Sequence, residues 1–128
     1  MRQEIETDLP SQGQPVSWAV SGNGMIHTTQ RPVREDGRIL EDDITEQTAR
    51  SLANLRRTLE QAGAGLEDVL QVQIFLTDRA DVKAVDAVYA RHFSAPYPSR
   101  SIVIVAGLTE PGMRIELTAV AALPARGR

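Results

Sequence analysis

Arg100 is the side chain whose type and position most directly suggest chemistry. It begins a predicted strand over residues 100–106, where it shares one face with Ile102 and Ile104. Two interpretations stay open at this point. The stem of the arginine can pack on its apolar neighbours while its head reaches water, or the planar guanidinium can bind a carboxylate through two parallel hydrogen bonds. The pattern alone favours the first interpretation.

Glu116 is the second candidate, in a predicted strand over residues 113–123. Ile115 and Leu117 occupy one face of this strand and Glu116 occupies the other. A carboxylate in a strand is either solvated or paired with a cation on a neighbouring strand, or it orients or deprotonates a water molecule. Without further information the first alternative is favoured.

Other side chains exclude several kinds of chemistry. The absence of cysteine rules out thiol catalysis, disulfides and thiolate metal sites. His27 and His92 stand far apart without a metal-ligand spacing, so we expect no metal. Ser99 and Ser101 have no histidine at a recognisable spacing, which disfavours a serine hydrolase. We interpret Trp18 as a packing residue, because no basic side chains stand beside it in the sequence.

Length and charge narrow the class of protein. The chain has 128 residues, of which 41% are hydrophobic and 24% are charged, as expected for one globular domain. A net charge of −3 provides no basic field, which disfavours nucleic acid as the principal partner. No apolar run approaches the ~20 residues of a membrane-spanning helix, and the N-terminus lacks the apolar core of a secretory signal. We therefore expect a cytoplasmic protein with no membrane partner.

Two regular segments are predicted in the first half of the chain. Residues 16–30 predict a β-hairpin with its turn at residues 21–24, since Asn and Gly tolerate the positive φ of a tight turn. Residues 44–62 predict a helix: Asp43 and Glu46 resemble a capping box at its start, and Gly63 is a suitable cap at its end. The expected apolar stripe of this helix consists of Thr48, Leu52, Leu55, Leu59 and Ala62.

The second half adds one more helix between strands. Residues 69–76 predict a strand with Leu70, Val72, Ile74 and Leu76 on one face and Phe75 on the other. Helical spacing follows from Val82 to Phe93, until Pro96 and Pro98 interrupt it. The strands at 100–106 and 113–123 complete the chain.

The order β-β-α-β-α-β-β predicts a single α+β domain over residues 15–123, between tails at 1–14 and 124–128. Both helices would cover the same side of a mixed sheet. The other side carries Phe75 and further apolar residues, so we expect it to contact another subunit of a homo-oligomer.

Several ordered segments resemble the Rid family, also called the YjgF or RidA-like family, of imine and enamine deaminases. The resemblance covers residues 15–123. Its segments are Thr28-Thr29-Gln30-Arg31-Pro32, residues 47–55, Leu59-Glu60-Gln61-Ala62-Gly63, Ile74-Phe75-Leu76-Thr77-Asp78, Pro98-Ser99-Arg100-Ser101 and residues 115–121.

The resemblance implies a chorismate-mutase-like fold, assembled as a homotrimer whose sheets form a barrel with active sites between subunits. It also implies a reaction without a cofactor, in which reactive 2-imino or 2-enamino carboxylates are hydrolysed to 2-oxo acids and ammonia. Arg100 matches the arginine of the family that binds the carboxylate, and Glu116 matches the glutamate that positions water. This reverses the preference for a structural role at both positions. An imine carbon is already electrophilic, so orientation and modest acid–base help suffice.

Four positions depart from the family pattern and are our candidate substrate-binding residues. Val16 replaces a tyrosine, Thr29 replaces a glycine, Ile102 stands where a small polar residue or cysteine is common, and Asp86 stands where an amide is often found. Val16 and Ile102 make the expected pocket more apolar, and Thr29 puts a Cβ where a glycine would let the substrate approach the backbone. These changes leave open a general imine deaminase, a specialist for an aminoacrylate- or aminomuconate-like enamine, and a trimer that binds small carboxylates or a protein without turnover. Family members are also described as ribonucleases, which the charge balance disfavours.

Overall fold

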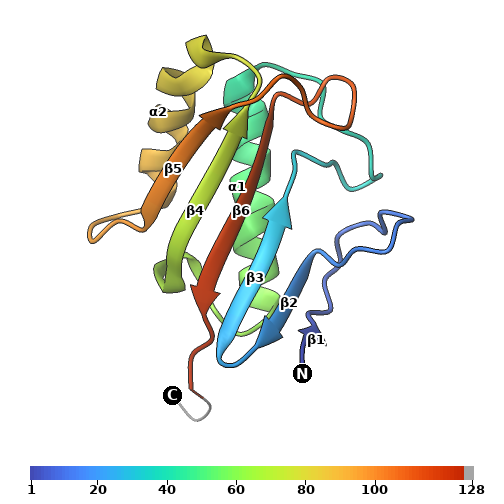
Figure 1. Ribbon diagram of the computed structural model, residues 1–128, viewed down its shortest axis with the longest axis vertical. Helices are drawn as coiled ribbons and strands as arrows, with labels where there is room; N and C mark the ends of the chain where they lie inside the picture. The colour runs from blue at the N-terminus through green and yellow to red at the C-terminus, as the bar shows by residue number, and fades with distance from the viewer. Residues whose placement is uncertain (126–128) are drawn as a thin grey trace.

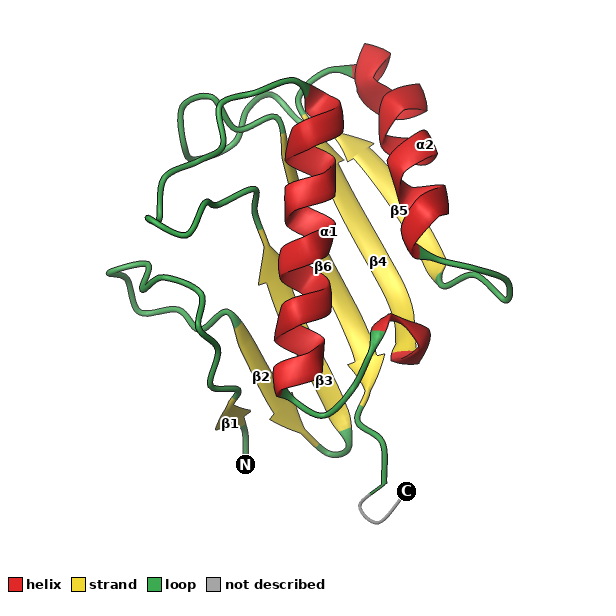
Figure 2. Cartoon of the chain, turned by 180° about the vertical axis from the view of Figure 1, so that it is seen from behind, coloured by secondary structure: helices red, strands yellow, loops and turns green. Residues whose placement is uncertain are grey.

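A six-stranded sheet with two helices on one of its faces forms the molecule (Figures 1 and 2). The structure is a computed structural model that describes residues 1–125. The strand order is β1-β2-β3-β6-β4-β5, and only the β4–β5 pair is parallel. The strands are β1 (Gln3–Glu4), β2 (Ala19–Gly22), β3 (Met25–Gln30), β4 (Val69–Leu76), β5 (Ser99–Ile104) and β6 (Ile115–Ala122). The predicted order of elements is confirmed, with β1 added at its start.

The hairpin β2–β3 is present, and its turn lies one residue later than predicted. Gly22 pairs with Met25, so Asn23 and Gly24 are the two central residues. Their φ angles are 53° and 77°. Because both central residues of this tight turn need positive φ, the turn is centred on the Asn-Gly pair.

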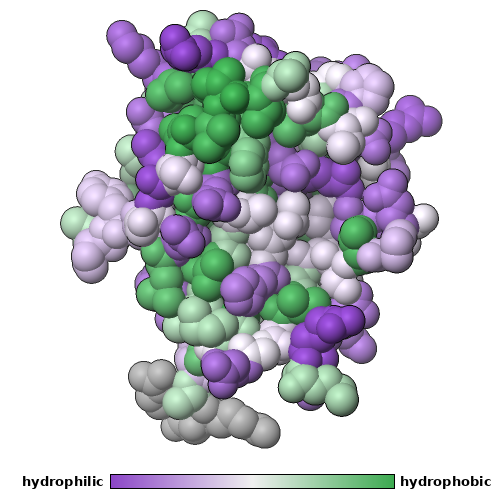
Figure 3. Space-filling view, in the orientation of Figure 1, coloured by the Kyte–Doolittle hydropathy of each residue, from purple (hydrophilic) through white to green (hydrophobic). Residues whose placement is uncertain are grey.

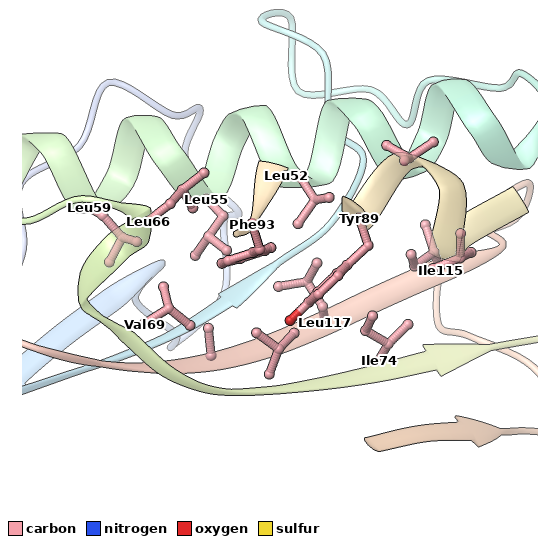
Figure 4. Packing of buried hydrophobic residues seen from close by; sticks show 14 of the residues in the cluster. Leu52, Leu55, Leu59, Leu66, Val69, Ile74, Tyr89, Phe93, Ile115 and Leu117 are labelled. Carbon is pink, nitrogen blue, oxygen red and sulfur yellow. The ribbon is translucent and has the colours of Figure 1, made fainter. Parts of the chain in front are cut away.

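Helix α1 (Ile44–Gln61) confirms the prediction for residues 44–62. The Asp43 carboxylate accepts a 2.9 Å hydrogen bond from the Glu46 amide, and Gly63 follows the helix with a φ of 83°. The stripe of Leu52, Leu55 and Leu59 is fully buried against the sheet (Figure 4).

Strand β4 corrects one part of the predicted pattern. Val72, Ile74 and Leu76 are buried as expected, but Val69 is buried and Leu70 is exposed. A bulge between Val69 and Gln71, opposite β6, puts Val69 instead of Leu70 on the buried face. The extra residue in a bulge reverses the alternation of faces on one side of it.

Helix α2 (Val82–His92) ends before the prolines that were expected to stop it. Phe93 leaves the helical conformation and turns into the core, where its ring stacks on Tyr89 at a centroid distance of 4.5 Å. Both helices cover the same face of the sheet, as predicted (Figure 2). Two short 3-10 helices, η1 (Leu66–Asp68) and η2 (Arg79–Asp81), lead into β4 and α2.

The expected tail at residues 1–14 packs against the domain instead. It contributes β1, Ile5 packs on the core, and the Asp8 carboxylate pairs with Arg57 of α1. The indole of Trp18 also donates a 2.9 Å hydrogen bond to the Pro10 carbonyl. The expected tail at 124–128 lies partly outside the described residues. No helix within residues 1–125 is long and apolar enough to cross a membrane.

Candidate active site

Arg100 lies on the helix-covered face of the edge strand β5. It pairs in register with Val72, which is fully buried beneath the helices. The guanidinium lies 4.6 Å from the ring centre of Tyr89, and its Nη2 is 2.8 Å from the Asp86 carboxylate oxygen. With 27% of its side chain exposed, Arg100 is held by two residues of α2. Neither interpretation of the strand pattern had included this ion pair.

Asp86 and Ile102 therefore join Arg100 in space, and Tyr89 joins them. Ile102 is partly buried against the core on the same face of β5. Tyr89 follows Asp86 by three residues, so both reach the same side of α2. We call these four residues the Arg100 cluster. Tyr89 was not predicted as a site residue. The one usable signal in the sequence was its spacing of three residues from Asp86, and no signal linked Tyr89 to Arg100.

Glu116 lies on the other face of the sheet, which no helix covers. It is the second residue of β6 and pairs with Phe75. The last β3–β6 pair is Gln30 with Leu117, so Arg31 follows β3 at the level of Glu116. Burial raises the pKa of the half-buried Glu116 carboxyl, while the positive charge of Arg31 opposes that rise. A carboxylate with a raised pKa is a better proton acceptor than an ordinary glutamate.

Thr29 lies on the same face of the sheet as Glu116, and Trp18 lies against Arg31. Thr29 pairs with Thr118 and faces the same side as Glu116. Trp18 is buried, as expected of a packing residue, but the guanidinium of Arg31 lies 5.5 Å from its ring centre. We call Glu116, Thr29, Arg31 and Trp18 the Glu116 cluster. Arg31 was not among the residues predicted from the sequence, although its place directly after a strand was a usable signal.

Val16 lies apart from Arg100 and Glu116, in the loop before β2. The residue is 53% exposed and borders a hollow formed by the N-terminal segment, which Trp18 also lines. Within residues 1–125, no three His, Cys, Asp or Glu side chains come together as a metal site.

The two clusters cannot act together within one chain. Arg100 and Glu116 extend from opposite faces of the sheet, two strands apart and three residues apart along the strands. Strand geometry puts their Cα atoms roughly 14 Å apart, with the sheet between the side chains. A substrate of a few carbon atoms can bridge Arg100 and Glu116 only if the two residues come from different copies of the chain.

An exposed apolar surface lies beside Glu116 on the helix-free face. Phe75 pairs with Glu116 on one side and with Val103 on the other, and Val103 is 45% exposed. Figure 3 shows hydrophobic residues gathered over the ends of β4 and β5. The predicted apolar character of this face is therefore concentrated at one end of it.

Comparisons with known proteins agree with this architecture. The family model described as endoribonuclease L-PSP matches residues 7–123. A RutC family protein of Pyrococcus abyssi is 38% identical over 84% of this chain and 85% of its own length. The chloroplastic Reactive Intermediate Deaminase A of Arabidopsis thaliana is 32% identical over 85% of this chain and 59% of its own length. The crystal structure of Escherichia coli TdcF with bound serine superposes with a TM-score of 0.85, at 31% identity over 94% of this chain and 98% of TdcF.

Proposed function

The chain belongs to the Rid (YjgF) family, which includes reactive intermediate deaminases, and on this premise we propose that it hydrolyses 2-imino and 2-enamino carboxylates to 2-oxo acids and ammonia. Its fold is the chorismate-mutase-like α+β fold of that family. The observation that carries the proposal is the pair of half-sites: a guanidinium on one face and a half-buried carboxylate on the other.

Arg100 would bind the substrate carboxylate. Asp86 occupies one side of the guanidinium, and the planar group keeps further N–H donors for a second carboxylate. The Tyr89 ring beneath it limits the directions in which the guanidinium can move. A bound carboxylate would fix the orientation of the adjacent imine carbon, which is the main requirement for hydrolysis of an electrophilic C=N bond.

Glu116 would position the attacking water and accept its proton. As the C–O bond forms, the C=N double bond becomes a single bond and the nitrogen takes up a proton. Collapse of the resulting carbinolamine breaks the C–N bond, releases ammonia and leaves the 2-oxo acid. Half-burial favours this role because it raises the pKa of Glu116 towards that of an effective base.

A second copy of the chain would complete the site. We propose a homotrimer in which β5 of one subunit brings Arg100 to Glu116 of its neighbour, with the helix-free faces inside a barrel. The apolar surface of the partly buried Phe75 and the exposed Val103 supports this arrangement, because exposed apolar patches mark contact surfaces.

Removal of each half-site tests the proposed function. A dehydratase generates 2-aminoacrylate in the assay, and semicarbazide traps what the protein does not hydrolyse. We expect the wild type to reduce semicarbazone formation and Arg100→Ala and Glu116→Gln to abolish that effect. Arg91→Ala and Glu60→Gln, on exposed sides of the helices, are the matched controls. A wild type without effect, or variants as active as the wild type, would contradict the proposal.

The Asp86–Arg100 ion pair favours one alternative, a trimer that binds small carboxylates without turnover. Asp86 competes with a ligand for the guanidinium, and Val16, Thr29 and Ile102 also change the expected pocket. Calorimetry that shows binding of 2-oxo acids by a protein without deaminase activity would support this alternative. The net charge of −3 gives no support to a ribonuclease function, despite the wording of the family description.

A further inference from the structure

Arg31 is a partly buried cation that acts on Glu116 through its charge but forms no ion pair with it. Its Nη2 donates a hydrogen bond to the Gln12 side chain, and its guanidinium lies over the Trp18 ring. Within residues 1–125, no carboxylate forms an ion pair with Arg31. A guanidinium has five N–H donors, and the hydrogen bond to Gln12 uses only one of those of Arg31. The remaining donors suit an anion that is not part of the chain.

A cavity of about 580 Å³ has Arg31 in its lining. Its lining comes from the segment before β2, the loop after β3 and the loop before β6. Figure 1 shows these three segments on the same side of the molecule. Three arginines, Arg31, Arg34 and Arg38, face two glutamates, Glu41 and Glu110, in its lining. Arg34 is paired with Asp36 at 3.5 Å, whereas Arg38, like Arg31, has no ion-pair partner within residues 1–125. The lining is therefore net positive, between walls that include Trp18 and Val33.

We propose that Arg31 determines specificity by binding a second carboxylate at the far end of the substrate, so that the preferred substrate is a short dicarboxylic imine. The inference rests on the proposed function and deepens it. Arg100 of one subunit would bind the carboxylate beside the imine carbon, and Arg31 of the next would bind the distal one. Arg31 suits this role because it follows β3 at the level of Glu116 and lines the cavity. A planar guanidinium matches a carboxylate through two hydrogen bonds.

Two imines of equal chain length test the proposal. An amino-acid oxidase forms 2-iminoglutarate from glutamate and 2-iminopentanoate from norvaline, and kcat and KM are measured for both. We expect the wild type to prefer the dicarboxylic imine, and Arg31→Leu to lower the ratio of the two kcat/KM values about tenfold or more, mainly through KM. Arg31→Lys should restore part of this ratio, because lysine keeps the positive charge but lacks the planar pair of N–H donors. The matched control Arg91→Leu should leave the ratio unchanged.

Binding of the products separates this inference from the proposed function. If the wild type hydrolyses neither imine, the deaminase proposal fails, and calorimetry with 2-oxoglutarate and 2-oxopentanoate decides the role of Arg31. Tighter binding of 2-oxoglutarate by the wild type, lost in Arg31→Leu with an unchanged melting temperature, supports the second carboxylate site. Equal affinities, or equal losses for both ligands or both imines, overturn it.

Discussion

Arg100 and Glu116 extend from opposite faces of one sheet, Arg100 towards α2 and Glu116 towards the face without helices. In the proposed trimer, the Arg100 and the Glu116 of one chain would therefore belong to two different sites. Each of the two residues has its own electrostatic partner, Asp86 for Arg100 and Arg31 for Glu116.

Asp86 pairs with Arg100, the proposed carboxylate-binding group, so replacement of Asp86 should strengthen ligand binding. In Asp86→Asn the amide keeps the size of the side chain but removes the charge that competes for the Arg100 guanidinium. We expect KM for 2-imino acids and Kd for 2-oxo acids to fall by at most about fivefold, the scale of a partly exposed ion pair. Steady-state kinetics and calorimetry measure both. A higher KM in Asp86→Asn would mean that Asp86 positions Arg100 for binding.

The hydroxyl and the ring of Tyr89 should contribute differently. The hydroxyl is buried and has no hydrogen-bond partner within the described residues, whereas the ring supports the guanidinium of Arg100. Tyr89→Phe should therefore be at least as stable as the wild type in urea unfolding, because it removes an unsatisfied polar group. Tyr89→Leu should weaken binding of 2-oxo acids, because it removes the aromatic face. Loss of binding in Tyr89→Phe would assign a role to the hydroxyl instead.

The Glu116 carboxylate should lower the free energy of unfolding at neutral pH, although the same group supports the proposed activity. Burial raises its pKa in the folded chain, so the folded state binds its proton more tightly than the unfolded state. Stability must then fall as pH rises from the unfolded-state pKa of about 4.3 through the raised folded-state pKa. Glu116→Gln removes this dependence, so it should be at least as stable as the wild type at neutral pH while losing activity. Urea unfolding at both ends of this pH range measures the difference, and a Glu116→Gln variant that is less stable at neutral pH would contradict it.

The apolar surface beside Glu116 should be required for assembly. A lysine at Val103 would place a charge among the residues that we expect a neighbouring subunit to cover. Val103→Lys should therefore sediment with the mass of one chain and lose activity, while Ala87→Lys on the exposed side of α2 should behave as the wild type. An active oligomer of Val103→Lys would remove this surface from the interface.

Local sequence patterns predicted the elements well but not their contacts. The stripe of Leu52, Leu55 and Leu59 identified α1 because helical period and burial agree there. The bulge at Leu70 escaped prediction because it depends on pairing with β6.

Only part of the candidate site could be predicted, because local patterns show which face of a strand a residue lies on but not which other elements it contacts. Alternation along each strand already put Arg100 with Ile102 and separated Glu116 from Leu117. Their relation across the sheet required the register through β4. The partners Asp86 and Arg31 come from other elements, and only the fold brings them to Arg100 and Glu116.

Complementation between two inactive variants tests the central claim, that one site combines Arg100 and Glu116 of different subunits. Arg100→Ala and Glu116→Gln are mixed, dissociated in denaturant and refolded together, and each variant refolded alone is the control. If the site lies between subunits, a random mixture should recover about one quarter of wild-type activity, because that share of sites receives both intact residues. If the mixture stays as inactive as the separate variants while wild type refolded in the same way is active, the two residues do not meet between subunits.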